Sequence, residues 1–79
     1  MSGYDAGEGD ILTKVSKRQG QILALYAQGK TYVQIAQILE ISRHTVDQHL
    51  RKVRSRAGCE TTVQAAVRYI SALRNVDVG

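Results

Sequence analysis

Apolar residues recur along this chain at intervals of three and four, which is the spacing of one face of an α-helix. Four such runs are present, over about residues 16–28, 31–39, 42–57 and 61–74. Neither the alternation of a half-buried strand nor the short turn of a hairpin separates them. The pattern therefore predicts an all-α protein with four helices.

Helix-capping residues mark the ends of these runs. In a capping box, a Ser or Thr oxygen accepts from a backbone amide and a Gln three residues later reaches back. The sequence offers three such pairs, Ser16 with Gln19, Thr31 with Gln34, and Thr61 with Gln64. Ser42 can cap the remaining helix, and Gly29 and Gly58 can take the left-handed conformation that ends a helix. These signals support the four-helix prediction.

The length of 79 residues accommodates one compact domain. Residues 1–13 combine three Gly with three acids and show no helical period, so we expect a flexible acidic leader whose Ile11 and Leu12 can touch the core. The folded domain is expected over residues 14–76. Trp and Phe are absent, so its core must be built from Leu, Ile, Val and Ala.

Several kinds of site are disfavoured by the composition. The single cysteine, Cys59, excludes an internal disulfide, and together with His44 and His49 it does not complete a zinc site. We interpret Cys59 as a packing residue, with a redox thiol as the less favoured alternative. The acids are scattered and no Gly-rich loop links a strand to a helix, so we expect neither catalysis nor a cofactor.

The amino acid sequence also gives no sign of a membrane location. No apolar run approaches the ~20 residues of a membrane span, and no secretory signal is visible at the amino terminus. We therefore expect a cytoplasmic protein that makes no membrane contact.

Positive charge is concentrated in one predicted helix. Residues 43–56 contain five basic side chains, Arg43, Arg51, Lys52, Arg54 and Arg56, and one acid, Asp47. A solvated helical face is the ordinary explanation for such a run. Here, however, the run follows a short helix and a tight connection at Glu40 and Ile41, which is the helix-turn-helix arrangement. This coincidence favours contact with the phosphates of duplex DNA.

The segment over residues 16–74 resembles the LuxR/GerE-type DNA-binding domain of bacterial transcription regulators. The resemblance is strongest in IAQILEIS, in the following TV and His49, and in QAAVRYI. It implies a four-helix domain whose helix over residues 42–57 is the recognition helix in the major groove, and whose last helix contributes to dimerisation. The chain departs from the family pattern at two positions. It has Gln19 where family members usually have an acidic residue, and Asp47 where they often have a basic or small polar residue.

Successive 100° steps along residues 43–57 place Val46, Leu50, Val53 and Ala57 on one side of the helix, which predicts a polar side facing DNA. The expected base contacts are His44, Asp47, Gln48 and Arg51. The expected phosphate contacts are Thr31, Tyr32, Arg43, Thr45, Lys52 and Ser55. Gln48 matches the hydrogen-bonding edge of adenine, and Arg51 matches that of guanine.

Two of these assignments have an ordinary structural alternative. Gln48 can be a solvated surface residue, and the Tyr32 ring can belong partly to the core. For His49 we favour packing and local hydrogen bonding over base contact.

The last predicted helix is apolar on two sides. One stripe comprises Val63, Ala66, Val67, Ile70 and Leu73, and the other comprises Ala65, Tyr69, Ala72 and Val76. Because one of them would be left in water on a monomer, we expect a two-fold homodimer through the second stripe, with its small residues allowing close approach.

The sequence thus favours a sequence-specific regulator that binds duplex DNA as a dimer and is associated with the nucleoid. RNA polymerase and a larger LuxR-type relative are further candidate partners. The main alternative is an interaction module that pairs with such a relative through the last helix and inhibits its DNA binding. A promoter reader resembling a sigma factor is a weaker alternative.

Overall fold

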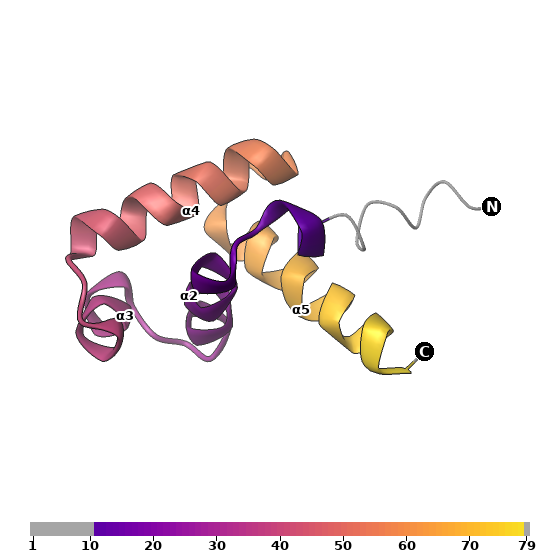
Figure 1. Cartoon of the computed structure of the whole chain (residues 1–79), viewed down its shortest axis with the longest axis horizontal. Coiled ribbons are helices and arrows are strands. Elements are labelled where there is room, and N and C mark those ends of the chain that lie inside the picture. Colours follow the sequence, from indigo (N-terminus) through magenta and orange to yellow (C-terminus); the bar gives the residue numbers. More distant parts are fainter. Residues whose placement is uncertain (1–10, 79) are drawn as a thin grey trace.

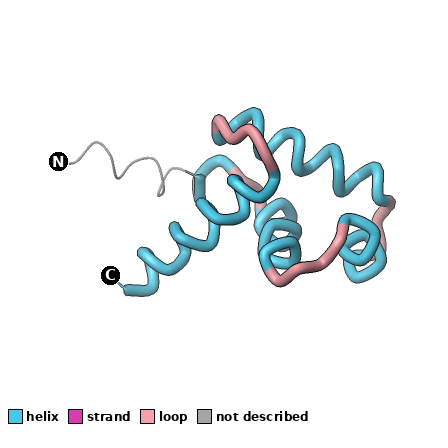
Figure 2. The backbone as a smooth tube through the Cα atoms, turned by 180° about the vertical axis from the view of Figure 1, so that it is seen from behind, coloured by secondary structure: helices cyan, strands magenta, loops and turns pink. Residues whose placement is uncertain are grey.

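The computed structural model describes the backbone of residues 11–78 and the side chains of residues 11–75. A short helical segment over residues 11–14 precedes four longer helices. These are α2 (Lys17–Ala27), α3 (Tyr32–Leu39), α4 (Arg43–Ala57) and α5 (Thr62–Val78). Within the described residues only helices and loops occur (Figure 2). The all-α prediction is therefore confirmed.

Capping boxes begin α2 and α3 as the sequence predicts. Ser16 Oγ accepts from the Gln19 amide at 3.1 Å, and Gln19 Oε1 accepts from the Ser16 amide at 2.9 Å. The hydroxyl of Thr31 and the side chain of Gln34 repeat this exchange at the start of α3. Each box satisfies backbone amides that have no partner within the helix.

The third predicted box is only half correct. Thr61 Oγ1 accepts from the Gln64 amide at 3.0 Å, but Gln64 Oε1 accepts from the amide of Glu60, at 2.7 Å, instead of that of Thr61. The helix that follows also continues to Val78, beyond the predicted end near Arg74.

The hydrophobic core lies around α2, which packs against α3, α4 and α5 (Figure 1). As expected, its fully buried large side chains are Leu, Ile and Val, namely Ile11, Ile22, Leu23, Ile35, Val46, Leu50 and Val53. Ile11 belongs to the expected leader and is buried, in agreement with the expectation that it can touch the core. Residues 1–10 lie outside the described residues.

Candidate nucleic-acid interface

Helices α3 and α4 are joined by a tight connection over residues 40–42. Glu40 takes a left-handed conformation with φ 59° and ψ 43°, and the Ile41 amide donates to the Ala36 carbonyl at 3.0 Å. Ser42 then caps α4, since its Oγ accepts from the Thr45 amide at 3.0 Å. The two helices and their short turn form the predicted helix-turn-helix unit.

Helix α4 carries its apolar and polar residues on opposite sides. Val46, Leu50 and Val53 are completely buried, which fixes the helix against the core. Six of the α4 side chains that were predicted to face DNA are exposed, namely Arg43, His44, Gln48, Arg51, Lys52 and Ser55. Thr45 is half-buried, with Oγ1 2.9 Å from Ser42 Oγ. The core thus holds a basic, exposed helix side in place.

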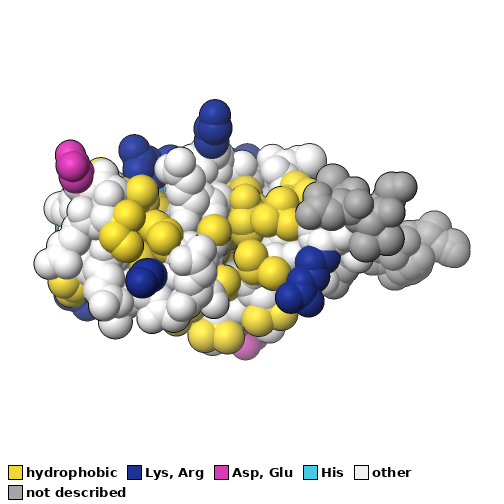
Figure 3. Space-filling view, turned by 90° about the horizontal axis from the view of Figure 1, so that it is seen from below, with side chains coloured by type: hydrophobic (Ala, Val, Ile, Leu, Met, Phe, Trp, Pro, Cys, Tyr) yellow, Lys and Arg dark blue, Asp and Glu magenta, His cyan; other side chains and the backbone are white. Residues whose placement is uncertain are grey.

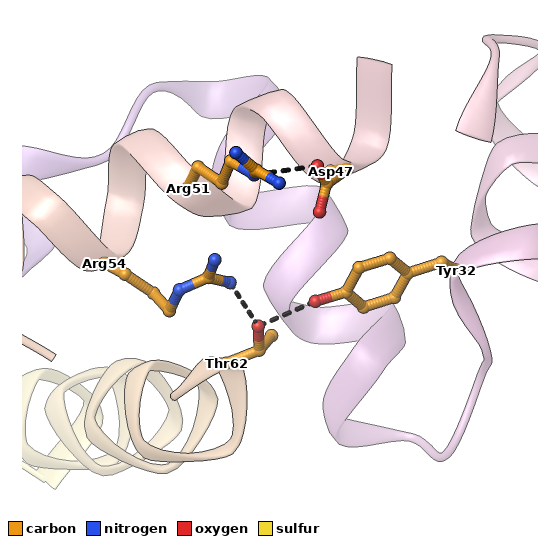
Figure 4. A network of polar contacts seen from close by, with 5 residues as sticks. All are labelled: Tyr32, Asp47, Arg51, Arg54 and Thr62. Atoms are coloured by element: carbon orange, nitrogen blue, oxygen red, sulfur yellow. Dashed lines mark hydrogen bonds and ion pairs between the residues drawn. The ribbon is translucent and has the colours of Figure 1, made fainter. Parts of the chain in front are cut away.

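The acid of this helix forms an ion pair with one of the bases. Asp47 Oδ2 lies 2.9 Å from Arg51 Nε, one helical turn away (Figure 4). The Arg51 side chain is 72% exposed and that of Asp47 is 32% exposed. Asp47 is therefore neither simply solvated nor independent of the arginine expected to read guanine.

Helices α3 and α4 bring several candidate residues together. Tyr32 from α3 and Arg43, His44 and Asp47 from α4 line a shallow hollow of about 300 Å³. Thr31, exposed at the cap of α3, directly precedes Tyr32 in the chain. Arg43 supplies the donors and positive charge that suit a phosphate, whereas the carboxylate of Asp47 in the same lining opposes one.

Tyr32 belongs to both the core and the polar surface. Its ring packs edge to face on Tyr26 with centroids 5.9 Å apart, as the core alternative predicts. Its hydroxyl lies 2.7 Å from Thr62 Oγ1, which also accepts from Arg54 Nη1 at 2.7 Å (Figure 4). One hydroxyl group therefore links the first turn of α5 to α3 and α4.

Arg54 and Thr62 also belong to this region, although neither was among the contact residues predicted from the sequence. For Arg54 a signal exists, because Asp47 and Arg54 follow Arg43 by four and eleven residues, which places all three on the same flank of the helix. For Thr62 no signal exists in the sequence. Its contact with Tyr32 joins residues 30 positions apart and depends on how α5 packs.

His49 lies at the edge of the core and not on the DNA side. Its Nδ1 is 3.4 Å from Gln19 Nε2, so the amide of the buried Gln19 donates to the imidazole ring. This contact supports the packing and hydrogen-bonding role favoured for His49.

Cys59 is also a buried residue, and Arg68 donates from Nη1 both to its sulfur, at 2.9 Å, and to the Ala57 carbonyl, at 2.7 Å. The packing interpretation of Cys59 agrees with this environment.

Among the described residues, no group of three or more His, Cys, Asp and Glu side chains is arranged to hold a metal ion. Over the same part of the chain, no helix has the length and apolarity needed to cross a bilayer.

Two residues of the α5 stripe expected at a dimer interface, Ala65 and Ala72, face the interior of their own chain, so the assignment is wrong for these two. Ala65 and Ala72 are 0% and 1% exposed. Tyr69 is half-buried and packs across α2, where a β-carbon on Gly20 would lie 2.5 Å from Tyr69 Oη. The lack of a side chain at Gly20 on α2 thus leaves room for the Tyr69 hydroxyl of α5. The side chain of Val76 lies outside the described residues.

The exposed side of α5 includes three residues of the other stripe, whereas Ala66 of that stripe is buried in the core and Ile70 is half-buried. Val63, Val67 and Leu73 are 57%, 62% and 37% exposed. With the end of α2 and the loop after it, this side forms an open groove of about 820 Å³ whose lining includes Tyr26 and Lys30. Figure 3, seen from the side opposite α4, shows hydrophobic side chains spread over much of the molecule, with Lys and Arg side chains standing between them.

Comparisons with known proteins agree with this geometry. Residues 13–69 match the luxR family of bacterial regulatory proteins. Over 66 residues the chain is 35% identical to a protein described as "Probable transcriptional regulatory protein SgaR" from Hyphomicrobium methylovorum. The similar region covers 84% of this chain and 31% of that protein, so the chain spans about a third of the length of this curated relative. No solved structure gives a significant match.

The family is one of regulatory, non-enzymatic proteins, which bears out the expectation that the chain is not an enzyme. The helix-turn-helix geometry and the match over residues 13–69 together show that this chain belongs to the luxR family of bacterial regulatory proteins, as a DNA-binding helix-turn-helix domain.

Proposed function

We propose that the chain binds duplex DNA sequence-specifically, with α4 in the major groove. The observation that carries this proposal is the exposed basic side of α4, held outward by the completely buried Val46, Leu50 and Val53. A helix of this kind fits the major groove, where each base pair presents its own pattern of donors and acceptors. Such a partner also implies a cytoplasmic, nucleoid-associated location.

Base reading is assigned to the side of α4 that projects from the core. The proposed base contacts are His44, Asp47, Gln48 and Arg51. The proposed phosphate contacts are Thr31, Tyr32, Arg43, Thr45, Lys52 and Ser55. Lys52 supplies a compact charge for a phosphate, whereas Arg51 offers the paired donors that match guanine.

Two chains would bind one site as a two-fold dimer through the exposed stripe of α5. Val63, Val67 and Leu73 supply apolar area that a monomer leaves in water, and a two-fold axis would bring the same stripe of two copies together. The dimer would then present two copies of α4 to similar half-sites about one helical turn apart, so the target would be roughly palindromic.

The same exposed stripe supports a second candidate function. It can pair with a larger LuxR-type relative, and a mixed dimer of this kind would inhibit the DNA binding of that relative. Contact with RNA polymerase would be a further use of this surface. Duplex binding by the chain alone distinguishes these functions, because the inhibitory module would form the mixed dimer without selecting duplex sites by itself.

The test is selection of bound sites from a random duplex pool, followed by sedimentation of the chain with the selected duplex. We expect an enriched, roughly palindromic site and two chains per duplex. Val67→Glu should reduce the complex to one chain, whereas Gln37→Glu, which adds the same charge at an exposed position of α3, should leave two. The absence of any enriched site would contradict the proposed function. One wild-type chain per duplex would contradict the dimer alone.

A further inference from the structure

The ion pair between Asp47 and Arg51 constrains how Arg51 can meet a base. A guanidinium group has two edges with paired N–H donors, one formed by Nε and a terminal nitrogen and the other by the two terminal nitrogens. Asp47 Oδ2 occupies Nε at 2.9 Å. The edge formed by the two terminal nitrogens therefore stays available, and its fork matches O6 and N7 of guanine.

Within the described side chains, Arg51 forms an ion pair with Asp47. The Arg51 side chain is 72% exposed. A long side chain with this freedom samples many rotamers, including rotamers that reach phosphates on either side of a groove. An acceptor one helical turn away, at the edge of the reading side, restricts this sampling.

We propose that Asp47 is a positioning residue that sets base specificity, because it presents the terminal edge of Arg51 to guanine and disfavours contact of Arg51 with phosphate. This inference rests on the proposed sequence-specific binding through α4. The negative charge of Asp47 opposes binding to any duplex. The proposed role explains how an acid on an otherwise basic helix can nevertheless serve DNA recognition.

Two effects of opposite sign follow from this role. Asp47→Ala removes a negative charge near the phosphates, so binding to unrelated duplex should tighten by about two- to fivefold at moderate salt. The same change releases Arg51, so a guanine preference of about 5- to 150-fold, the range expected for a paired contact, should fall several-fold. A charge effect alone would change affinity for all sequences together.

The experiment measures the affinity of the full chain for three kinds of duplex. The first is a selected duplex, the second is a set in which the base pair affected by Arg51→Ala is replaced by each of the other three base pairs, and the third is an unrelated duplex. Asp47→Ala should lower the preference for guanine while tightening binding to the unrelated duplex. In the Arg51→Ala background, Asp47→Ala should not change base preference further. Glu60→Ala, which removes the same charge from an exposed position outside α4, should leave base preference unchanged.

Four results would overturn the inference. The first is that Asp47→Ala leaves the guanine preference intact, and the second is that it changes base preference by the same factor in the wild-type and Arg51→Ala backgrounds. The third is that it strengthens specific binding with the preference preserved, which would mean that Asp47 withholds Arg51 from DNA. Selection of a site at which Arg51→Ala affects no guanine would also overturn it, although the proposed function would stand. Failure to select any site would instead contradict the proposed function.

Discussion

Helices α4 and α5 each have a side in the core and a side in solvent, but residue type marks the two sides differently. In α4 the sides differ in polarity, with Leu50 completely buried and Gln48 exposed. In α5 both sides are apolar, with Ala65 buried and Val67 62% exposed. The buried apolar residues described in α5 are alanines, whereas its exposed apolar residues are Val and Leu, so the two sets differ in size and not in polarity.

The polarity contrast in α4 predicts the largest difference in stability. Leu50→Ala should lower the free energy of unfolding by about 2–5 kcal/mol, since it leaves a cavity at a completely buried position. Gln48→Ala should change it by less than about 0.5 kcal/mol, because this side chain is exposed. Denaturant unfolding followed by circular dichroism measures both. Equal losses would mean that α4 is oriented incorrectly.

The size contrast in α5 predicts a smaller but more diagnostic difference. Ala65→Leu should destabilise the monomer by about 1–3 kcal/mol, because the added atoms overfill the close packing around α5. Val67→Leu should leave the unfolding free energy within about 0.5 kcal/mol of wild type. Measurement at low protein concentration separates these effects from dimerisation. If Val67→Leu were the damaging change, the sequence-based assignment of the stripes would be restored.

The link between α3, α4 and α5 predicts an effect of about 1 kcal/mol. Thr62→Val keeps the shape of a buried side chain but removes the oxygen that contacts Tyr32 and Arg54. Thr62→Ser keeps that oxygen and should retain most of the stability. In a double-mutant cycle, Thr62→Val and Tyr32→Phe should be clearly non-additive. Additive losses would show that the Tyr32 and Thr62 hydroxyl groups do not act together.

The connection between α3 and α4 predicts the smallest effect, and it is stabilising. Glu40 is a non-glycine residue with a φ of 59°, a conformation in which a β-carbon is crowded. Glu40→Gly should therefore raise the unfolding free energy by about 0.5–1 kcal/mol, despite the greater freedom of glycine in the unfolded chain. A loss of stability in the same unfolding assay would mean that the Glu40 side chain makes a larger contribution than backbone strain.

Much of the fold could be predicted because its determinants are local. The capping pairs of α2 and α3 lie three residues apart, and the buried side of α4 follows from polarity and helical period alone. The end of α5 could not be predicted in this way, because no glycine or proline follows Arg74 until Gly79.

The candidate site was predictable to the extent that it lies on one helix. The exposed residues of α4 were identified from their period, whereas Thr62 was missed because its role depends on tertiary packing. The ion pair between Asp47 and Arg51 has the spacing of neighbours on a helix, so the sequence permits it. The sequence does not determine which guanidinium nitrogen of Arg51 contacts Asp47.

The most direct test of sequence-specific reading by α4 compares Arg51→Ala with Lys52→Ala on a selected duplex and its single-base variants over a range of salt concentrations. We predict that Arg51→Ala weakens binding to the selected site by about 1–3 kcal/mol and relaxes preference at one base pair. Lys52→Ala should weaken binding to all sequences alike and reduce the salt slope by about one. If both substitutions weakened binding equally on every duplex, α4 would contact the backbone without reading the bases, and the central claim would be contradicted.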